Sequence, residues 1–391
     1  MTEATAATTS SATKRSVPRA EHVGSLLRPA VLQQAAEAHV NTLGSAVDAV
    51  DTQATSDLRE LTEEHIRQVV ARQESIGLDV ITDGEFGRIL FTDSFYGAVS
   101  GFDLTEAKLV WKDETGQQIE TPFMPAATRR LERTGSPLAA EATVLSSLTD
   151  LPFKLTLPAA SISCAPETCR PDLYGDAYAD EDELANHVVK LEREIIDDAV
   201  AAGAKYIQVD LGLYPYLVDP DQLDRLAALG ADPQALLDRF LRVDRATIEG
   251  LPEGVQTSMH LCRGNLKSMW LWRGSLEPVA ERMFHELPFD RFLVEMDDVE
   301  RDGDYSFLRH VPRGTDGPVV VMGIVSTKKP QLENEDALIR AIEQASQYLP
   351  IEQLALSPQC GFASNAAGNA LSEDDQWRKL ELVVRVADRV W

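Results

Sequence analysis

The chain has 391 residues, 44% of them hydrophobic, and carries 37 Lys and Arg against 63 Asp and Glu, a formal net charge of −26. A protein of that charge repels nucleic acid and anionic membranes at long range, so we expect neither as a partner. No apolar run reaches the roughly 18–20 residues that span a bilayer. The composition therefore favours a soluble cytoplasmic enzyme that acts on small molecules.

The first 18 residues are small and polar and lack the apolar stretch of a secretory signal. We expect a disordered tail over residues 1–18 and a single catalytic domain over residues 19–391. Four cysteines are too sparse to form a disulfide framework in a chain of this length: Cys164, Cys169, Cys262 and Cys360. A homo-oligomer is compatible with this composition, which does not fix the oligomeric state.

Eight short apolar runs, each ending in a polar or glycine-containing turn, predict β-strands. They cover residues 22–25, 79–85, 153–160, 206–212, 255–262, 291–298, 318–326 and 354–361. Apolar residues at helical spacing predict helices over residues 56–77, 181–203, 233–250, 275–287 and 335–348. Strands that alternate with helices pair in parallel, and eight such units favour an α/β fold closed as a (β/α)8 TIM barrel.

One segment, residues 109–123, interrupts the alternation and predicts a β-hairpin around Thr115 and Gly116. It follows the second predicted strand, so we expect an insertion in the barrel at that point. An open doubly wound sheet is the alternative fold. That fold would require a glycine-rich phosphate loop, and the chain contains neither GxGxxG nor GxxxxGKS/T.

Four residues near the ends of predicted strands could bind a metal ion together. His260 and Cys262 stand two apart on one strand and so share a face, Glu295 ends the next strand, and Cys360 ends the last. In a barrel these strand ends open onto the same mouth, and a set with two thiolates favours zinc over magnesium or calcium. Each residue alone also has an ordinary structural interpretation, as a small buried side chain or as a hydrogen-bonded polar residue at the end of a strand. The spacing does not decide between these structural roles and a metal site.

Six sequence motifs together resemble the cobalamin-independent methionine synthase family: HVGSLLRP, ITDGEF, HLCRGN, LVEMDD, VMGIVSTKKPQLENEDALIRAIEQA and LALSPQCGFAS. The resemblance is closest to its short, single-barrel members and extends from about residue 19 to the C-terminus. It implies that zinc is bound by His260, Cys262, Glu295 and Cys360, with Glu295 as the exchangeable ligand. A metal ion at bonding distance stabilises a substrate thiolate, which then attacks an electrophilic carbon.

The same resemblance implies a binding site for the thiol substrate. Carboxylates at Glu85 and Asp210 are expected to hold the amino group of homocysteine, and the turn at Gly24 and Ser25 its carboxylate. His22, at the start of that turn, is a candidate general acid or base.

Three departures from the family pattern lie on the side of the alkyl donor. Cys164 stands where the family has a tryptophan that stacks on folate, which argues against folate as the donor. The histidine of a His-Ser-Pro stretch is replaced in Val325-Ser326-Thr327-Lys328, so Lys328 or water is expected to supply a proton. An Asp-Glu-Pro stretch becomes Asp210-Leu211-Gly212 and loses a carboxylate.

We therefore predict a zinc-dependent thiol alkyltransferase that methylates a homocysteine-like thiol to give methionine. Its partners are a small-molecule thiol and an alkyl donor. One alternative is the opening of an epoxide by coenzyme M, a reaction of the same superfamily, with Arg28, Arg88 and Arg263 as candidates for binding its sulfonate. Another is a zinc-binding barrel without enzymatic activity.

Overall fold

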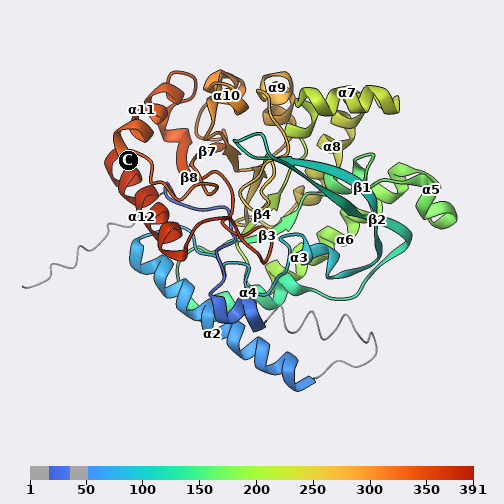
Figure 1. The fold of residues 1–391 in the computed structure, drawn as a ribbon, viewed down its shortest axis with the longest axis horizontal. Coiled ribbons are helices and arrows are strands. Elements are labelled where there is room, and N and C mark those ends of the chain that lie inside the picture. The colour runs from blue at the N-terminus through green and yellow to red at the C-terminus, as the bar shows by residue number, and fades with distance from the viewer. Residues whose placement is uncertain (1–16, 36–51) are drawn as a thin grey trace, which may run out of the picture.

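The computed structural model describes residues 17–35 and 52–391 (Figure 1). Most of the tail expected over residues 1–18 lies outside the described residues. Within the described part of the chain, no helix is both long and apolar enough to cross a lipid bilayer.

Six parallel strands form the central sheet, in the order β3-β4-β5-β6-β7-β8. Their bounds are Leu155–Pro158 (β3), Tyr206–Asp210 (β4), Gln256–Leu261 (β5), Arg291–Glu295 (β6), Val319–Val325 (β7) and Leu354–Pro358 (β8). Every residue of β3, β4, β6 and β8 is buried. Strands covered on both faces are continuous apolar runs, which is why the sequence predicts them well.

The two strands predicted over residues 22–25 and 79–85 do not form as such. The first segment makes a single isolated parallel bridge just before the predicted strand, between Ala20 and Leu356, and the second makes one between Ile81 and Phe153. The backbone N–H of Asp79 also donates to the carbonyl of Ala20 at 2.9 Å, which joins these two segments. The second segment is short because Gly84 and Glu85 take positive φ values of 72° and 58°, which turn the chain out of an extended course.

Helices surround the strands in Figure 1. The longer ones are α2 (Thr52–Ile76), α4 (Pro137–Leu148), α6 (Glu181–Ala201), α7 (Pro220–Leu229), α8 (Pro233–Ile248), α9 (Glu277–Glu286), α11 (Glu335–Ala345) and α12 (Glu373–Val390). Short helices are α3 (Asp93–Tyr96), α5 (Pro171–Tyr174) and α10 (Val299–Asp302), with 3₁₀ turns η1 (Ala160–Cys164), η2 (Gly175–Ala177), η3 (Pro215–Leu217), η4 (Tyr305–His310) and η5 (Ile351–Gln353).

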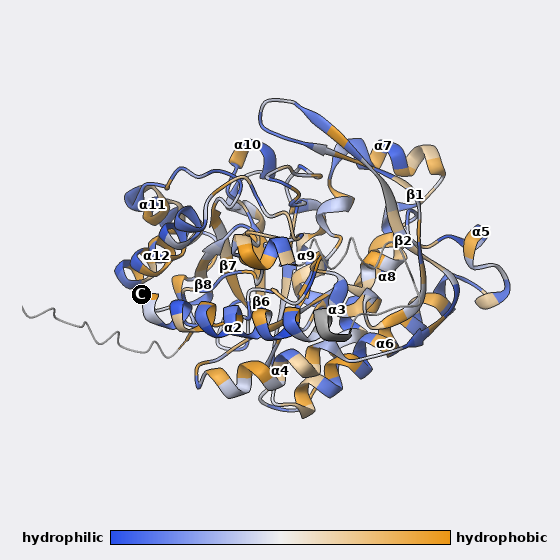
Figure 2. Ribbon diagram, turned by 60° about the horizontal axis from the view of Figure 1, so that its bottom comes forward, coloured by the Kyte–Doolittle hydropathy of each residue, from blue (hydrophilic) through white to orange (hydrophobic). Residues whose placement is uncertain are grey.

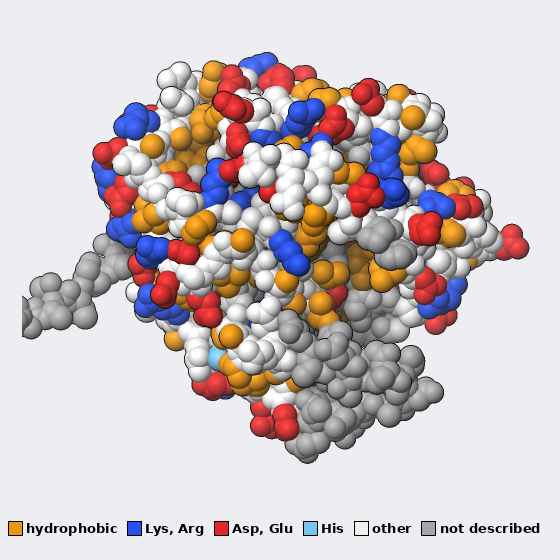
Figure 3. All heavy atoms as spheres, viewed as in Figure 1, with side chains coloured by type: hydrophobic (Ala, Val, Ile, Leu, Met, Phe, Trp, Pro, Cys, Tyr) orange, Lys and Arg blue, Asp and Glu red, His pale blue; other side chains and the backbone are white. Residues whose placement is uncertain are grey.

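The five predicted helices correspond to α2, α6, α8, α9 and α11. Figure 2 shows apolar and polar residues on the same helices, as expected where one side of a helix packs inward. On the face drawn in Figure 3, acidic and basic side chains are interspersed, with hydrophobic side chains between them.

The hairpin expected over residues 109–123 lies within a longer antiparallel pair, β1 (Val99–Lys112) and β2 (Gln118–Arg133). Its turn is closed by Asp113, whose Oδ1 accepts hydrogen bonds from the backbone of Thr115 and Gln117 at 2.8 and 2.9 Å. The backbones of Lys112 and Trp270 exchange two hydrogen bonds of 2.8 Å. The hairpin is thereby fixed against the loop that follows β5.

Alternate residues of the strands form layers that lead up to the functional site. Near the amino ends, Glu21 is buried in ion pairs with Lys154 at 2.9 Å and Arg291 at 2.6 Å. Burial alone would raise the pKa of Glu21, but these two cations outweigh it and lower the pKa to about 2. The next layer is an apolar cluster made of Val23, Leu293, Val321 and Ala355. The carboxyl ends of the strands then carry the polar side chains described below.

Candidate metal and substrate site

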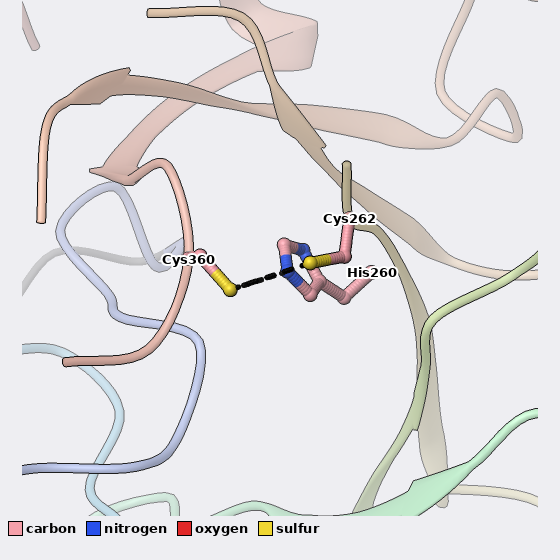
Figure 4. A group of neighbouring side chains, drawn as sticks. All are labelled: His260, Cys262 and Cys360. Carbon is pink, nitrogen blue, oxygen red and sulfur yellow. Dashed lines mark hydrogen bonds between the residues drawn. The ribbon is translucent and has the colours of Figure 1, made fainter. Parts of the chain in front are cut away.

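Three of the four predicted metal ligands lie together at the carboxyl ends of the strands. His260 is on β5, Cys262 follows that strand, and Cys360 follows β8. His260 Nε2 lies 3.4 Å from Cys360 Sγ, and the two sulfurs lie 3.5 Å apart. All three side chains are buried and point toward one another (Figure 4). Their ligand atoms lie within 4.8 Å of each other, a group that could hold a metal ion.

The spacing of these atoms fits a tetrahedral zinc ion. Zn–S bonds of about 2.3 Å and Zn–N bonds of about 2.0–2.1 Å separate tetrahedral ligand atoms by roughly 3.5–3.8 Å. The Nδ1–H of His260 donates to the Leu293 carbonyl at 3.1 Å, which leaves Nε2 free to face the sulfurs. The N–H of Gly264 donates to Cys262 Sγ at 3.3 Å. These contacts orient one imidazole and two sulfurs as a zinc site requires.

The electrostatics of the cluster favour a thiolate at Cys360. The hydrogen bond from the Cys262 thiol lowers the pKa of Cys360 well below its usual range. Burial opposes that shift, and the charge of a protonated His260 reinforces it. A thiolate is the form of cysteine that binds metal ions.

Glu295, the fourth predicted ligand, is buried at the end of β6 but does not belong to this group of ligand atoms. Its Oε1 accepts hydrogen bonds from Lys328 Nζ at 2.7 Å and Arg301 Nη2 at 3.0 Å. Its Oε2 accepts one from the backbone N–H of Arg263 at 2.8 Å. Burial alone would raise the pKa of Glu295, but the charges of Lys328 and Arg301 outweigh it and lower that pKa to about 2.

A pocket opens beside the His–Cys–Cys cluster, and all three predicted substrate-binding residues line it. It encloses about 480 Å³ of space, part of which is open to solvent. Ser25, Glu85 and Asp210 line its polar part together with the three cluster residues. The remainder includes the larger side chains Phe91, Trp111, Leu211 and Leu271.

The two carboxylates of the pocket are buried and individually held. Glu85 Oε1 accepts a hydrogen bond from Thr156 Oγ1 at 2.7 Å, and Asp210 Oδ1 accepts one from Gln208 Nε2 at 2.6 Å. Burial raises the pKa of Asp210 to about 7 and also raises the pKa of Glu85. Two carboxylates with raised pKa values would gain from a cationic group placed between them.

The two predicted catalytic residues lie elsewhere. Among the described residues that line the pocket, neither His22 nor Lys328 is present. His22 Nε2 instead donates to Gln73 Oε1 at 2.8 Å, and burial lowers the pKa of His22 to about 4. Cys164, which stands at the family's tryptophan position, is also outside the pocket lining, and its thiol lies 3.7 Å from the Ala160 carbonyl.

Two further residues of the pocket were not anticipated as functional from the sequence. Trp111 reaches it from the hairpin, with its Nε1 donating to Thr121 Oγ1 at 2.9 Å. Asn265 donates to the Gly361 carbonyl at 2.7 Å, and its buried Oδ1 has no partner among the described residues. Asn265 belongs to the HLCRGN motif, so the sequence offered a signal for it. The position of Trp111 in the pocket depends on how the hairpin packs, which the sequence does not show.

The fold and the site define a class of proteins: α/β enzymes with a parallel sheet and, at the carboxyl ends of its strands, a His–Cys–Cys cluster that could hold a metal ion. The family model described as "Cobalamin-independent synthase, Catalytic domain" matches residues 36–388, and the chain belongs to this family. It is a methionine-synthase-like transferase.

Three relatives show the extent of the similarity. YxjG of Bacillus subtilis, an uncharacterized protein, is 32% identical over 381 residues, which cover 95% of this chain and 94% of YxjG. The 5-methyltetrahydropteroyltriglutamate–homocysteine methyltransferase of Aeromonas salmonicida is 24% identical over 82% of this chain but only 37% of that longer enzyme. A solved structure from Listeria monocytogenes, assigned to the vitamin-B12-independent methionine synthases, superposes with a TM-score of 0.71 at 26% identity. The superposition covers 95% of this chain and 98% of that one.

Proposed function

We propose that this protein methylates a homocysteine-like thiol to give methionine, and that the thiol is activated at a zinc ion bound by His260, Cys262 and Cys360. The observation that carries the proposal is that this cluster and the carboxylates of Glu85 and Asp210 line one pocket. A bound zinc ion would supply Lewis acidity that lowers the pKa of the substrate thiol. Family membership supports methyl transfer as the reaction.

The polar part of the pocket suits the amino-acid portion of homocysteine. Glu85 and Asp210 offer two carboxylates to an ammonium group, and Ser25 offers a hydroxyl to a carboxylate. The turn that carries Ser25 is fixed to the segment after Cys360, because the N–H of Phe362 donates to the Ser25 carbonyl at 2.9 Å. The substrate would thus be held by groups attached to the same segment as a metal ligand.

The charge of the lining disfavours coenzyme M as the thiol. A sulfonate requires a cationic or strongly donating site, and no Lys or Arg is among the described residues that line the pocket. Arg88 is engaged by Glu141 at 2.6 Å, and Arg263 by Asp302 at 3.0 Å. Epoxide opening by coenzyme M is therefore the weaker of the two enzymatic functions.

The donor, in this proposal, lies against the apolar wall formed by Phe91, Trp111 and Leu271. Trp111 offers an aromatic face to a flat or methylated group, although it comes from the hairpin rather than from the strand where the family has its tryptophan. No Lys or Arg is among the described residues that line the pocket, so a polyanionic tail of the donor would have to extend beyond it.

We further propose that the sheet closes as an eight-stranded (β/α)8 barrel with the hairpin as an insertion after the second strand. Support comes from the parallel bridges at Ala20 and Ile81, one at each edge of the six-stranded sheet, and from the hydrogen bond that joins Asp79 to Ala20. A reducing compartment such as the cytoplasm suits the site, because two thiols 3.5 Å apart would be prone to form a disulfide elsewhere.

A thiol titration tests the function. Homocysteine and coenzyme M are added separately to the zinc-loaded protein near neutral pH in weak buffer, and the protons released are counted. We expect homocysteine to release about one proton per zinc and coenzyme M to release none at the same concentration. The metal-free protein is the control. Proton release by coenzyme M alone, or by neither thiol, would refute the proposal.

A further inference from the structure

Trp111 differs from the other tryptophans in what meets its ring. Of the other four, three carry an Arg or Lys over the ring and one packs edge to face on a tyrosine: Trp270, Trp377, Trp391 and Trp272. Within the described part of the chain, neither a cation nor an aromatic ring covers Trp111. It lines the pocket, and its Nε1 is held by Thr121 Oγ1 at 2.9 Å. Because an aromatic face attracts a cation, this ring is available to a cationic ligand.

The charge of the pocket also favours a cationic ligand. Glu85 and Asp210 line it with two carboxylates, and no Lys or Arg is among the described lining residues. In the proposed function, the ammonium and carboxylate of homocysteine cancel, so its thiolate adds a further negative charge. A methyl donor that carries a positive charge would therefore be attracted to the pocket, whereas an anionic donor would be repelled.

The pocket offers no unassigned acid to protonate a leaving group. Apart from the His–Cys–Cys cluster, the titratable side chains among its described lining residues are Glu85 and Asp210, which the proposed function assigns to the substrate ammonium. His22 and Lys328 lie outside that lining and are engaged by other side chains. A methylated amine such as methyltetrahydrofolate leaves readily only when its nitrogen is protonated. A methylsulfonium leaves as a neutral thioether and needs no proton.

We propose that the methyl donor is a sulfonium compound whose charged sulfur lies against the ring of Trp111. The inference rests on the proposed function, because homocysteine is the methyl acceptor. The bond between the donor sulfur and its methyl group breaks, and its electron pair stays on that sulfur, which becomes a neutral thioether. The homocysteine thiolate gives an electron pair to the methyl carbon, and methionine forms.

The proton balance of this reaction differs from that of a folate donor. The thiol proton of homocysteine passes to the solvent, and the thioether product does not take it up. Each turnover therefore releases one proton. Transfer from methyltetrahydrofolate would return a proton to the leaving nitrogen, so that reaction releases none.

The number of protons released per homocysteine consumed tests the donor class. The zinc-loaded, full-length protein is mixed with homocysteine in weak buffer at about pH 7 and supplied separately with S-methylmethionine, S-adenosylmethionine or methyltetrahydrofolate. We expect turnover of at least one of the two sulfonium compounds, with about one proton released per homocysteine consumed. Methyltetrahydrofolate should react at least about 100-fold more slowly, since no acid assists its departure.

Trp111→Leu tests whether the ring recognises the charge, because leucine keeps an apolar side chain without a ring. We expect the KM for the sulfonium donor to rise about tenfold in Trp111→Leu and less than about threefold in Trp111→Phe. Proton release on homocysteine binding should be unchanged in both variants. Trp377→Leu is the matched control, because Trp377 is on α12, outside the pocket lining, and already carries Arg72 over its ring.

Preferential turnover of methyltetrahydrofolate without net proton release would overturn the proposal. So would the absence of transfer from both sulfonium compounds while homocysteine still releases its proton on binding, since thiol activation then stands and only the donor class fails. If homocysteine binding releases no proton, the proposed function itself fails, which is a different result. An unchanged donor KM in Trp111→Leu would overturn the place given to Trp111.

Discussion

Gly24 and Glu85 are in such close contact that a side chain at position 24 would displace the carboxylate. A Cβ built on Gly24 would lie 2.6 Å from Glu85 Oε1. Gly24→Ala should therefore push Glu85 out of the pocket and remove one charge-assisted contact to the substrate ammonium, worth about 1.5–3 kcal/mol. We expect the KM for homocysteine to rise roughly 10- to 100-fold while zinc content is unchanged.

Gly87→Ala is the matched control for that substitution, because a Cβ there meets nothing within 4 Å. Its KM for homocysteine should equal that of the unaltered protein. An unchanged KM in Gly24→Ala would mean that Glu85 does not bind the thiol substrate.

The cysteines divide into two pairs with different expected effects on zinc. Cys262→Ala and Cys360→Ala each remove a sulfur from the cluster, so zinc measured by atomic absorption should fall from about one per chain to less than about a tenth after dialysis. Cys164→Ala alters an equally buried thiol outside the cluster and should retain its zinc. Full zinc content in either cluster variant would contradict the proposed site.

Trp111 should affect the donor and leave the thiol unaffected. Trp111→Ala removes the aromatic wall that the hairpin contributes to the pocket, and stacking on such a ring is worth about 0.5–1.5 kcal/mol beyond the area it buries. We expect the KM for the methyl donor to rise roughly tenfold. Methionine formation would be measured with methyltetrahydrofolate and, separately, with S-methylmethionine as the donor.

Trp111→Phe, which keeps a ring, should lose less than Trp111→Ala, and homocysteine affinity should stay the same in both variants. Trp377→Phe serves as a control, because Trp377 is on α12, where its ring contacts Arg72 of α2, and is not among the residues that line this pocket. Equal donor KM values in all three variants would place the donor elsewhere.

The sequence predicts those parts of the site that depend on local geometry. His260 and Cys262 share a face because residues two apart on a strand do so, and the parallel order of strands brings Cys360 to the same end of the sheet. The strands predicted over residues 22–25 and 79–85 are reduced to single bridges at Ala20 and Ile81. An apolar pattern does not reveal where positive φ values, as at Gly84 and Glu85, end the pairing.

The rest of the site depends on contacts between residues far apart in the chain. Arg301, on the short helix α10, and Lys328, in the loop after β7, both contact Glu295, and the ion pair with Lys328 joins residues far apart in the chain that local spacing does not connect. The place of Trp111 in the pocket depends on how the hairpin folds back over the strand ends, where the backbone of Lys112 pairs with that of Trp270. A hairpin can be predicted from its turn, but its direction of packing cannot.

Asp244 gives a test of stability against pH at a position away from the site. Its Oδ1 accepts from the Ser161 N–H at 2.9 Å and its Oδ2 from the Tyr214 hydroxyl at 3.0 Å. Burial raises the pKa of Asp244 from 3.8 to about 7. Since the folded-state pKa lies above the unfolded one, the stabilising contribution is fully present below about pH 4 and is lost as pH rises toward 7. Within that window this group should lower the free energy of unfolding by about 1.4 kcal/mol per pH unit.

Asp244→Asn can keep both hydrogen bonds without the charge. In urea unfolding, the free energy of unfolding of this variant, relative to that of the unaltered protein, should therefore increase from pH 4 to 7 and stay constant above pH 7. A difference that is independent of pH would mean that Asp244 ionises normally in the folded protein.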